Sequence, residues 1–168
     1  CRSQFTGDFV LSTPVTNFTQ ARQVAAYIDG ALRTITKANG FRTDIGLRCF
    51  RGRRRIDDTH VPCCVLIEAD DKPGDNAGRD SIKITQPYAL VGYAPCDPDH
   101  PNDAAHAAIR DMKRAVFNTA GVPDSRLGGK ARDLAYLGRD IGPRADGAAF
   151  VLAALEVGVE YAENVANP

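Results

Sequence analysis

Carboxylates gather in the middle of the chain, where several of them follow or interrupt candidate strands. They are Asp57, Asp58, Glu68, Asp70, Asp71, Asp75 and Asp80. Carboxylates that converge at the ends of strands hold the metal ions of two-metal nucleases, so a metal-dependent nuclease is one hypothesis. Loops also collect Asp for turn formation and solubility, and only Glu68 falls clearly within a predicted strand. The segment 70–80 lacks the ligand spacing of an EF-hand, with Pro73 in the wrong place.

The strongest local excess of positive charge lies just before those aspartates. It consists of Arg51, Arg53, Arg54 and Arg55, with Asp57 and Asp58 beside it. A solvated hairpin tip and a nucleic-acid contact both suit such a tract, but no aromatic side chains are interleaved with it to stack on bases. Arg is favoured at protein interfaces because its planar guanidinium pairs with a carboxylate through two hydrogen bonds. We therefore expect a subunit or partner interface here. The candidate acidic partners within the chain are Asp70, Asp71, Asp75 and Asp80.

Other motifs that carry chemistry do not assemble. The stretch Leu127–Lys130 resembles the end of a phosphate-binding loop, but Asp124 stands where Gly is required and Ala131 follows the Lys. His100 and His106 are six residues apart, a spacing that does not bring them to one metal on a helix. We expect no catalytic residues, no bound metal and no cofactor, and therefore a protein that is not an enzyme.

Cysteine usage indicates packing rather than cross-linking. The five cysteines are Cys1, Cys49, Cys63, Cys64 and Cys96. They contain no C-x-x-C pair, and the adjacent Cys63 and Cys64 point to opposite faces if they lie in a strand. The sequence therefore predicts reduced, mostly buried cysteines in a protein made in a cytoplasm.

Length and composition predict one globular domain. The chain has 168 residues, of which 43% are apolar and 25% charged, and this is sufficient for a single core. Lys plus Arg equals Asp plus Glu at 21 each, so no global field attracts nucleic acid or an anionic membrane. No apolar stretch is long enough to span a bilayer. We expect a single domain over 1–168, with 1–16 as a loose N-terminal arm and with 70–80 and 121–148 as long loops.

Two segments carry the apolar spacing of amphipathic helices. The first should run from about 18 to 38, with Asn17 as its N-cap and Asn39-Gly40 as its end. The second should begin with Asn102 or Asp103 as its cap, after Pro95, Pro98 and Pro101, and should stop at Gly121. The first apolar stripe is Ala21, Val24, Ala25, Ile28, Ala31, Leu32 and Ile35, and the second is Ala105, Ala108, Ile109, Met112, Ala115 and Val116.

Alternating residues predict strands between and after these helices. We expect strands at 41–49, 63–67, 82–93 and 150–161, the first two joined as a hairpin, and only a short strand-like stretch at 134–137 within the irregular segment 121–148. The second of them is continuously apolar, which places it in the middle of a sheet. The fold class that follows is α+β: a mostly antiparallel sheet of about four strands with the two main helices packed on one face.

The order of these elements is similar to a known family. The first half of the chain resembles the tail terminator (minor tail protein U type) of long-tailed bacteriophages. The likeness lies in the first helix and the segment Asn39–Gly46 after it, and in Arg51-Gly52 and Val61-Pro62 before an apolar strand. The stretches Ala105–Phe117 and Leu134–Arg139 and the closing strand ending at Tyr161 continue the likeness. It covers roughly residues 20–68 and 105–161.

That resemblance implies an assembly role. It implies a subunit that forms a ring, expected to be a hexamer, which caps the finished tail tube and presents its other face to the head-side connector or stopper protein. Genomic DNA would pass through the lumen without specific binding, and the protein would be assembled in the bacterial host cytoplasm and end in the tail or neck of the virion, with no membrane partner. The loops 70–80 and 121–148 look longer than the family's minimum. A different neck or tail-completion protein and the metal-dependent nuclease remain the alternatives.

Overall fold

The computed structural model describes residues 19–119, 121–143 and 147–166. The predicted N-terminal arm 1–16 and the predicted cap Asn17 lie outside these ranges. The helices are α1 (Gln20–Arg33) and α2 (Pro101–Phe117), with short 3₁₀ turns η1 (Lys37–Asn39), η2 (Ile45–Leu47) and η3 (Asp58–His60). The strands are β1 (Cys49–Arg51), β2 (Cys63–Glu68), β3 (Lys72–Gly78), β4 (Ser81–Pro95), β5 (Asn118–Thr119), β6 (Val122–Pro123), β7 (Asp133–Ile141) and β8 (Phe150–Asn164).

Helix α1 forms where the sequence predicted it but is shorter at its C-terminal end. Thr19 is the N-cap, and its hydroxyl accepts a hydrogen bond from the backbone N–H of Arg22. The helix ends at Arg33, and a separate 3₁₀ turn follows, which Gly40 closes in the left-handed conformation. The predicted stripe is confirmed at its centre: Val24, Ala25, Ile28, Leu32 and Ile35 are all buried.

Helix α2 confirms the second stripe completely. Ala105, Ala108, Ile109, Met112, Ala115 and Val116 are buried. The helix begins at Pro101, one residue before the first predicted cap, with His100 at the N-cap position. Pro suits the first turn because its missing N–H would have no helical partner there. The helix stops at Phe117 rather than at Gly121, because the chain continues directly into the small β5–β6 hairpin.

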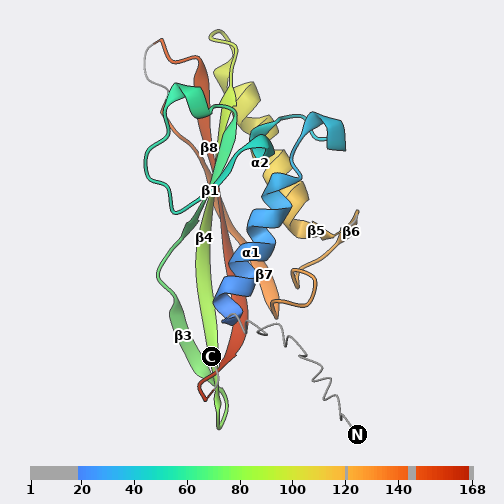
Figure 1. Cartoon of the computed structure of the whole chain (residues 1–168), viewed down its shortest axis with the longest axis vertical. Helices are drawn as coiled ribbons and strands as arrows, with labels where there is room; N and C mark the ends of the chain where they lie inside the picture. The colour runs from blue at the N-terminus through green and yellow to red at the C-terminus, as the bar shows by residue number, and fades with distance from the viewer. Residues whose placement is uncertain (1–18, 120, 144–146, 167–168) are drawn as a thin grey trace, which may run out of the picture.

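The main sheet has six strands in the order β1-β2-β4-β8-β7, with β3 pairing the remaining part of β4. Strands β4 and β8 form its spine, paired antiparallel over their whole length from Ser81 opposite Asn164 to Pro95 opposite Phe150. Fifteen residues at about 3.4 Å each make this spine roughly 50 Å long. Figure 1 shows it running along the longest axis of the molecule.

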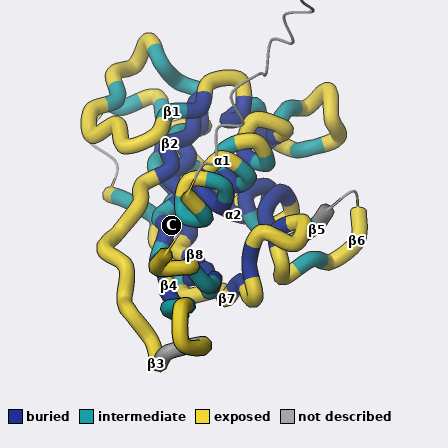
Figure 2. Tube along the Cα trace, turned by 60° about the horizontal axis from the view of Figure 1, so that its bottom comes forward, coloured by how far each residue is buried: buried dark blue, intermediate teal, exposed yellow. Residues whose placement is uncertain are grey.

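Both helices cover one face of this sheet, as predicted. In Figure 1, α1 and α2 lie on the same side of the strands, and α2 packs against β4 and β8 while α1 packs against β1, β2 and β8. The alternate residues of β8 that face the helices, from Val151 to Tyr161, are buried. Figure 2 shows this buried layer between helices and sheet, and shows β3 exposed beyond it. The prediction of two main helices packed with a mostly antiparallel sheet is therefore confirmed in outline, but the sheet has six strands instead of about four, and α1 reaches β1 and β2 while α2 lies on β4 and β8.

The predicted strand over 41–49 is wrong. Only Cys49 belongs to a strand, and the preceding residues form an irregular segment ending in η2. Their backbone groups bond elsewhere: the N–H groups of Arg42 and Thr43 donate to the carboxylate of Asp111, and the N–H of Gly46 donates to the carbonyl of Ile35. Gly46 also sits where a Cβ would lie 2.4 Å from the carbonyl oxygen of Leu32. Alternating residue types here reflect packing on helix ends, not a ladder.

The predicted hairpin before the central strand is also wrong. Strands β1 and β2 pair in parallel, with Cys49 opposite Cys64 and Arg51 opposite Leu66. A parallel pair needs a connection that returns to the starting end, and the segment 52–62 provides it. The prediction that this strand lies inside the sheet is confirmed, since β2 lies between β1 and β4, and Cys63–Leu66 are buried.

Two predicted loops contain strands. Within 70–80, β3 pairs with the first residues of β4, and its ladder is interrupted by register shifts between Pro73 and Asn76 and again before Gly78. These irregularities, together with Pro and Gly, removed the alternation that would have marked a strand. Within 121–148, where the sequence predicted an irregular segment with a short strand-like stretch at 134–137, the structure has the nine-residue strand β7 (Asp133–Ile141), with a register shift after Tyr136.

Candidate assembly surface

The arginines of the predicted tract have different roles in the structure. Arg51 ends β1, and its Nε donates to Glu68 Oε1 at 2.9 Å, so its charge is already paired within the subunit. Arg53 places its guanidinium 4.5 Å from the ring centre of Phe50, a cation–π contact. Arg54 and Arg55 are exposed and make no ion pair with any residue that the structure describes. The charges free to meet a partner are therefore those of Arg53, Arg54 and Arg55.

The connection that carries these arginines is held against the sheet at its far end. Asp57 accepts hydrogen bonds from the backbone N–H and the hydroxyl of Thr59, and these bonds hold the pKa of Asp57 below its ordinary value. Arg48 Nη1 donates to the carbonyl of Thr59 at 2.5 Å. The ring of His60 meets Phe50 edge to face, and its buried Nδ1 lies 2.6 Å from Asp57 Oδ1 without the alignment of a hydrogen bond. Asp58 is exposed at the start of η3.

The predicted acidic partners lie along a different part of the molecule. Asp70 and Asp71 are exposed in the link between β2 and β3, Asp75 is exposed in β3, and Asp80 is exposed in the turn before β4. No group of three or more His, Cys, Asp or Glu side chains in the described ranges is arranged to hold a metal ion. The carboxylates follow one another along a strand edge, so the structure does not assemble the converging set that a two-metal nuclease needs.

The basic and acidic groups share one edge of the sheet. Strands β2 and β3 pair with successive parts of β4 on the side away from β8. In Figure 1 the connection from β1 to β2 lies beside the upper part of this edge, and β3 lies at its lower end. Two copies that paired Arg54 with Asp75 reciprocally would be related by a two-fold axis. A ring requires contacts between two different surfaces, and on the opposite edge β7 exposes Asp133 and Asp140.

Apolar side chains also gather on the sheet face away from the helices, which we call the outer face. Its members are Phe50, Val65, Ile67, Val91, Tyr93, Leu137, Phe150, Leu152 and Ala154. Val65 and Val91 are buried, but Ile67 is 39% exposed and Leu137 54% exposed. Sequence reasoning did not single out this face. The sequence did carry a signal for it. In 82–93 and 150–161, apolar residues also occupy some of the alternate positions that point away from the helices, where a solvent-exposed sheet face would be polar.

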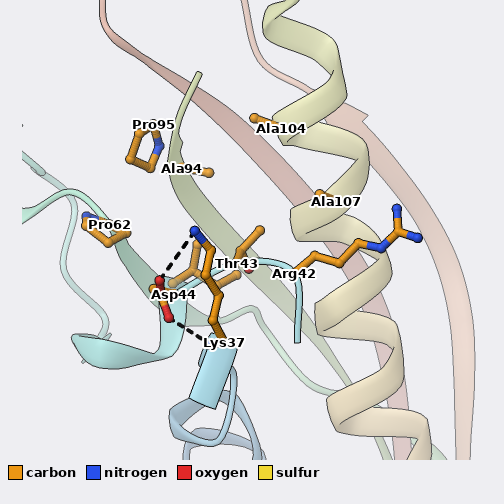
Figure 3. A pocket seen from close by; sticks show the side chains of 10 residues that line it. Lys37, Arg42, Thr43, Asp44, Pro62, Ala94, Pro95, Ala104 and Ala107 are labelled. Carbon is orange, nitrogen blue, oxygen red and sulfur yellow. Dashed lines mark hydrogen bonds and ion pairs between the residues drawn. The ribbon is translucent and has the colours of Figure 1, made fainter. Parts of the chain in front are cut away.

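A small hollow opens between α2 and the segment after η1. Figure 3 shows Lys37 and Asp44 on one side of it, Ala104 and Ala107 of α2 on the other, and Pro62 above. Lys37 donates its backbone N–H to Asp44 at 2.8 Å, and its ammonium lies 3.8 Å from the same carboxylate. The volume is about 210 Å³, below the roughly 300 Å³ of most small-molecule sites. In its lining the Lys37 ammonium lies beside the Asp44 carboxylate, and the Thr43 hydroxyl donates to the buried carboxylate of Asp111.

Comparisons with known proteins add a likeness of fold. No protein-family model matches the chain, and no curated protein matches it. Among solved structures, a chain in the virion of a native gene transfer agent particle is similar, with a TM-score of 0.51 and 12% sequence identity. The match covers 81% of this chain and 92% of that chain. At this identity the likeness establishes that the two chains share a fold over most of their lengths. Within the described ranges, no helix combines the length and the apolar character needed to cross a membrane.

Proposed function

We propose that this protein is a structural subunit of a phage-like particle and, within that class, the tail terminator that caps the tail tube as a ring. The observation that carries the proposal is the fold shared with a chain of a gene transfer agent virion, which extends over 92% of that chain. The sequence resemblance to tail terminators over roughly 20–68 and 105–161 supports the finer assignment, since these segments contain α1 and most of α2 and of the spine strand β8.

In this proposal the protein acts by binding other proteins and is not an enzyme. It joins the tail tube protein on one side of the ring and the head-side connector or stopper protein on the other, and it becomes part of the virion neck. DNA passes through the lumen without specific contacts. The exposed Arg53, Arg54 and Arg55, the protruding β3 and the partly exposed outer face supply surface for these contacts.

The geometry favours one arrangement of the ring. Heterologous contacts bring two different surfaces of the subunit together, and the Arg-bearing edge and the β7 edge lie on opposite sides of the sheet. We therefore propose that Arg54 and Arg55 meet carboxylates of the next subunit's β7 edge or of the tube protein. Pairing with the predicted Asp70, Asp71, Asp75 and Asp80 instead would join the same edge of two subunits, which gives a two-fold contact and not a ring.

Native mass measurement and particle imaging of the purified protein test the ring. A closed ring of identical subunits, expected to contain six, supports the proposal. A species that stays monomeric or two-fold symmetric at every concentration, and that cleaves branched or linear DNA with magnesium or manganese, contradicts it. Loss of that cleavage in Asp70→Asn would then establish the nuclease alternative.

A second experiment distinguishes a terminator from another neck protein. Tail tube protein is polymerised in vitro with and without this protein, and the tubes are imaged. A terminator should bind one end of each tube and stop further growth. Binding to the connector with no effect on tube growth would assign the protein to a different neck component.

A further inference from the structure

Two thiols face each other at the two ends of the Arg-bearing connection, one on β1 before it and one on β2 after it. Cys49 of β1 and Cys64 of β2 are opposite each other in the parallel ladder, and their Sγ atoms are 2.8 Å apart. The register is held by neighbouring backbone bonds, because Cys64 N–H donates to the carbonyl of Arg48 and Gly52 N–H donates to the carbonyl of Leu66, both at 2.9 Å. Both thiols belong to the core on the helix side of the sheet.

The surroundings of the two thiols differ in a way that makes one of them the nucleophile. The hydrogen bond that Cys49 shares with Cys64, aided by the charge of nearby Arg33, lowers the pKa of Cys49. The Arg33 guanidinium is anchored there, since Nη2 donates to the carbonyl of Cys49 at 3.1 Å. The hydrogen bond to Cys49 and complete burial raise the pKa of Cys64. On the other sheet face, burial raises the pKa of Cys63 to about 11.

We propose that Cys49 and Cys64 form an oxidisable dithiol site that a small hydroperoxide converts to a disulfide. The Cys49 thiolate attacks one oxygen of hydrogen peroxide, the O–O bond breaks, and sulfenic acid and water form after proton transfer. The Cys64 sulfur then attacks the sulfenic sulfur, its proton leaves with the hydroxyl group as a second water, and the S–S bond forms. Two thiols are oxidised by two electrons in total and one peroxide is reduced to two waters, so no further reactant is needed.

The cross-link would restrain the segment that carries the arginines. Strand β1 has three residues and pairs in the sheet only with β2, and the connection 52–62 starts from its end. A disulfide from residue 49 to residue 64 closes a loop around the whole connection and removes conformational freedom from the unfolded chain. The oxidised protein should therefore melt roughly 6 to 12 °C above the reduced protein.

Peptide mapping without reduction tests the site. The folded protein is treated with hydrogen peroxide, remaining thiols are blocked, and the protein is digested with trypsin. The expected product joins peptide 49–51 to peptide 56–79, since cleavage follows Arg48, Arg51, Arg55 and Arg79 while Pro73 protects Lys72. Because peptide 56–79 contains both Cys63 and Cys64, the matched variants are Cys63→Ser, which should keep the cross-link, and Cys64→Ser, which should lose it.

Treatment in denaturant provides the second control. In the unfolded chain Cys49 should join Cys63 and Cys64 with similar yields, whereas the folded protein should join only Cys64. If the folded wild type and Cys63→Ser both show Cys49 and Cys64 as separate blocked or over-oxidised residues, the proposal is wrong. It is also wrong if folded Cys64→Ser cross-links as completely as wild type.

Discussion

The irregular segment before β1 depends on one buried carboxylate, and removing that carboxylate is the sharpest test of the fold. Asp111 lies on α2 and is 2% exposed. Its Oδ2 accepts three hydrogen bonds, from Arg42 N–H at 2.9 Å, from Thr43 N–H at 2.7 Å and from the Thr43 hydroxyl at 2.8 Å. We expect Asp111→Ala to be among the most destabilising single substitutions in α2.

The magnitude follows from which donors can find water. Arg42 is exposed, so its N–H can be solvated after the substitution, but Thr43 is buried and both of its donors lose their acceptor. Bonds to a charged acceptor contribute about 1.5 to 3 kcal/mol each, so the two bonds from Thr43 give a total loss of about 3 to 6 kcal/mol. For a protein of this size that is a fall of roughly 6 to 24 °C in melting temperature.

Urea unfolding followed by circular dichroism measures this loss. Asp111→Asn keeps one acceptor oxygen and should cost about half as much, and Thr43→Val, which removes only the hydroxyl, should cost about 1.5 to 3 kcal/mol. Asp103→Ala on the exposed side of the same helix is the matched control and should cost less than 1 kcal/mol. If Asp111→Ala unfolds within ~0.5 kcal/mol of wild type, the carboxylate does not hold the segment and the reasoning is refuted.

Three further predictions concern the hydrophobic core, the loss of stability at alkaline pH and the assembly of subunits. Ile109→Asp should cost several kcal/mol because the side chain is 2% exposed and the new charge has no partner, as read from thermal melting and soluble yield. Burial raises the pKa of Tyr161 to about 12, so stability should fall as the pH rises from 10, where the unfolded tyrosine ionises, through 12, and it should fall less in Tyr161→Phe. Changing Arg53–Arg55 together to Ser should leave melting nearly unchanged but weaken assembly, and raising salt should loosen the wild-type assembly.

Each of these predictions has a matched control and an outcome against it. The control for the core is Val122→Asp, at a position 64% exposed, which should melt at the same temperature as wild type. If Ile109→Asp also melted at the wild-type temperature, α2 would not face the core. Equal slopes of stability against pH between 10 and 12 for wild type and Tyr161→Phe would show that the Tyr161 hydroxyl is not buried. Replacing exposed Arg110, Arg126 and Arg132 by Ser removes the same charge elsewhere. If the Arg53–Arg55 variant assembled as well as wild type at every salt concentration, these arginines would have no role in assembly and would form only a solvated loop.

Local patterns were enough to identify the elements that bury a continuous stripe. The spacing that marked Ile28 and Ile109 recurs every three or four residues, and the alternation that marked Leu155 recurs every two, so each element has one face that must leave water. This requirement is encoded within ten to twenty neighbouring residues. It therefore determined both helices, the spine strands β4 and β8, and the placement of the helices on one side of a sheet.

Contacts between residues far apart in the sequence decided the conformation of the segment before β1 and the direction in which β1 pairs with β2. The segment before Cys49 looks like a strand until Asp111, about seventy residues later, takes its backbone donors. Whether β1 and β2 pair in parallel or as a hairpin depends on the route that the connection 52–62 takes between them, and no local residue pattern distinguishes the two. The same pairing places Cys49 opposite Cys64 and sets the basic and acidic groups along one edge. By itself the sequence determined which surfaces leave water, and only the folded chain decided which polar groups become neighbours, because their partners lie far apart along it.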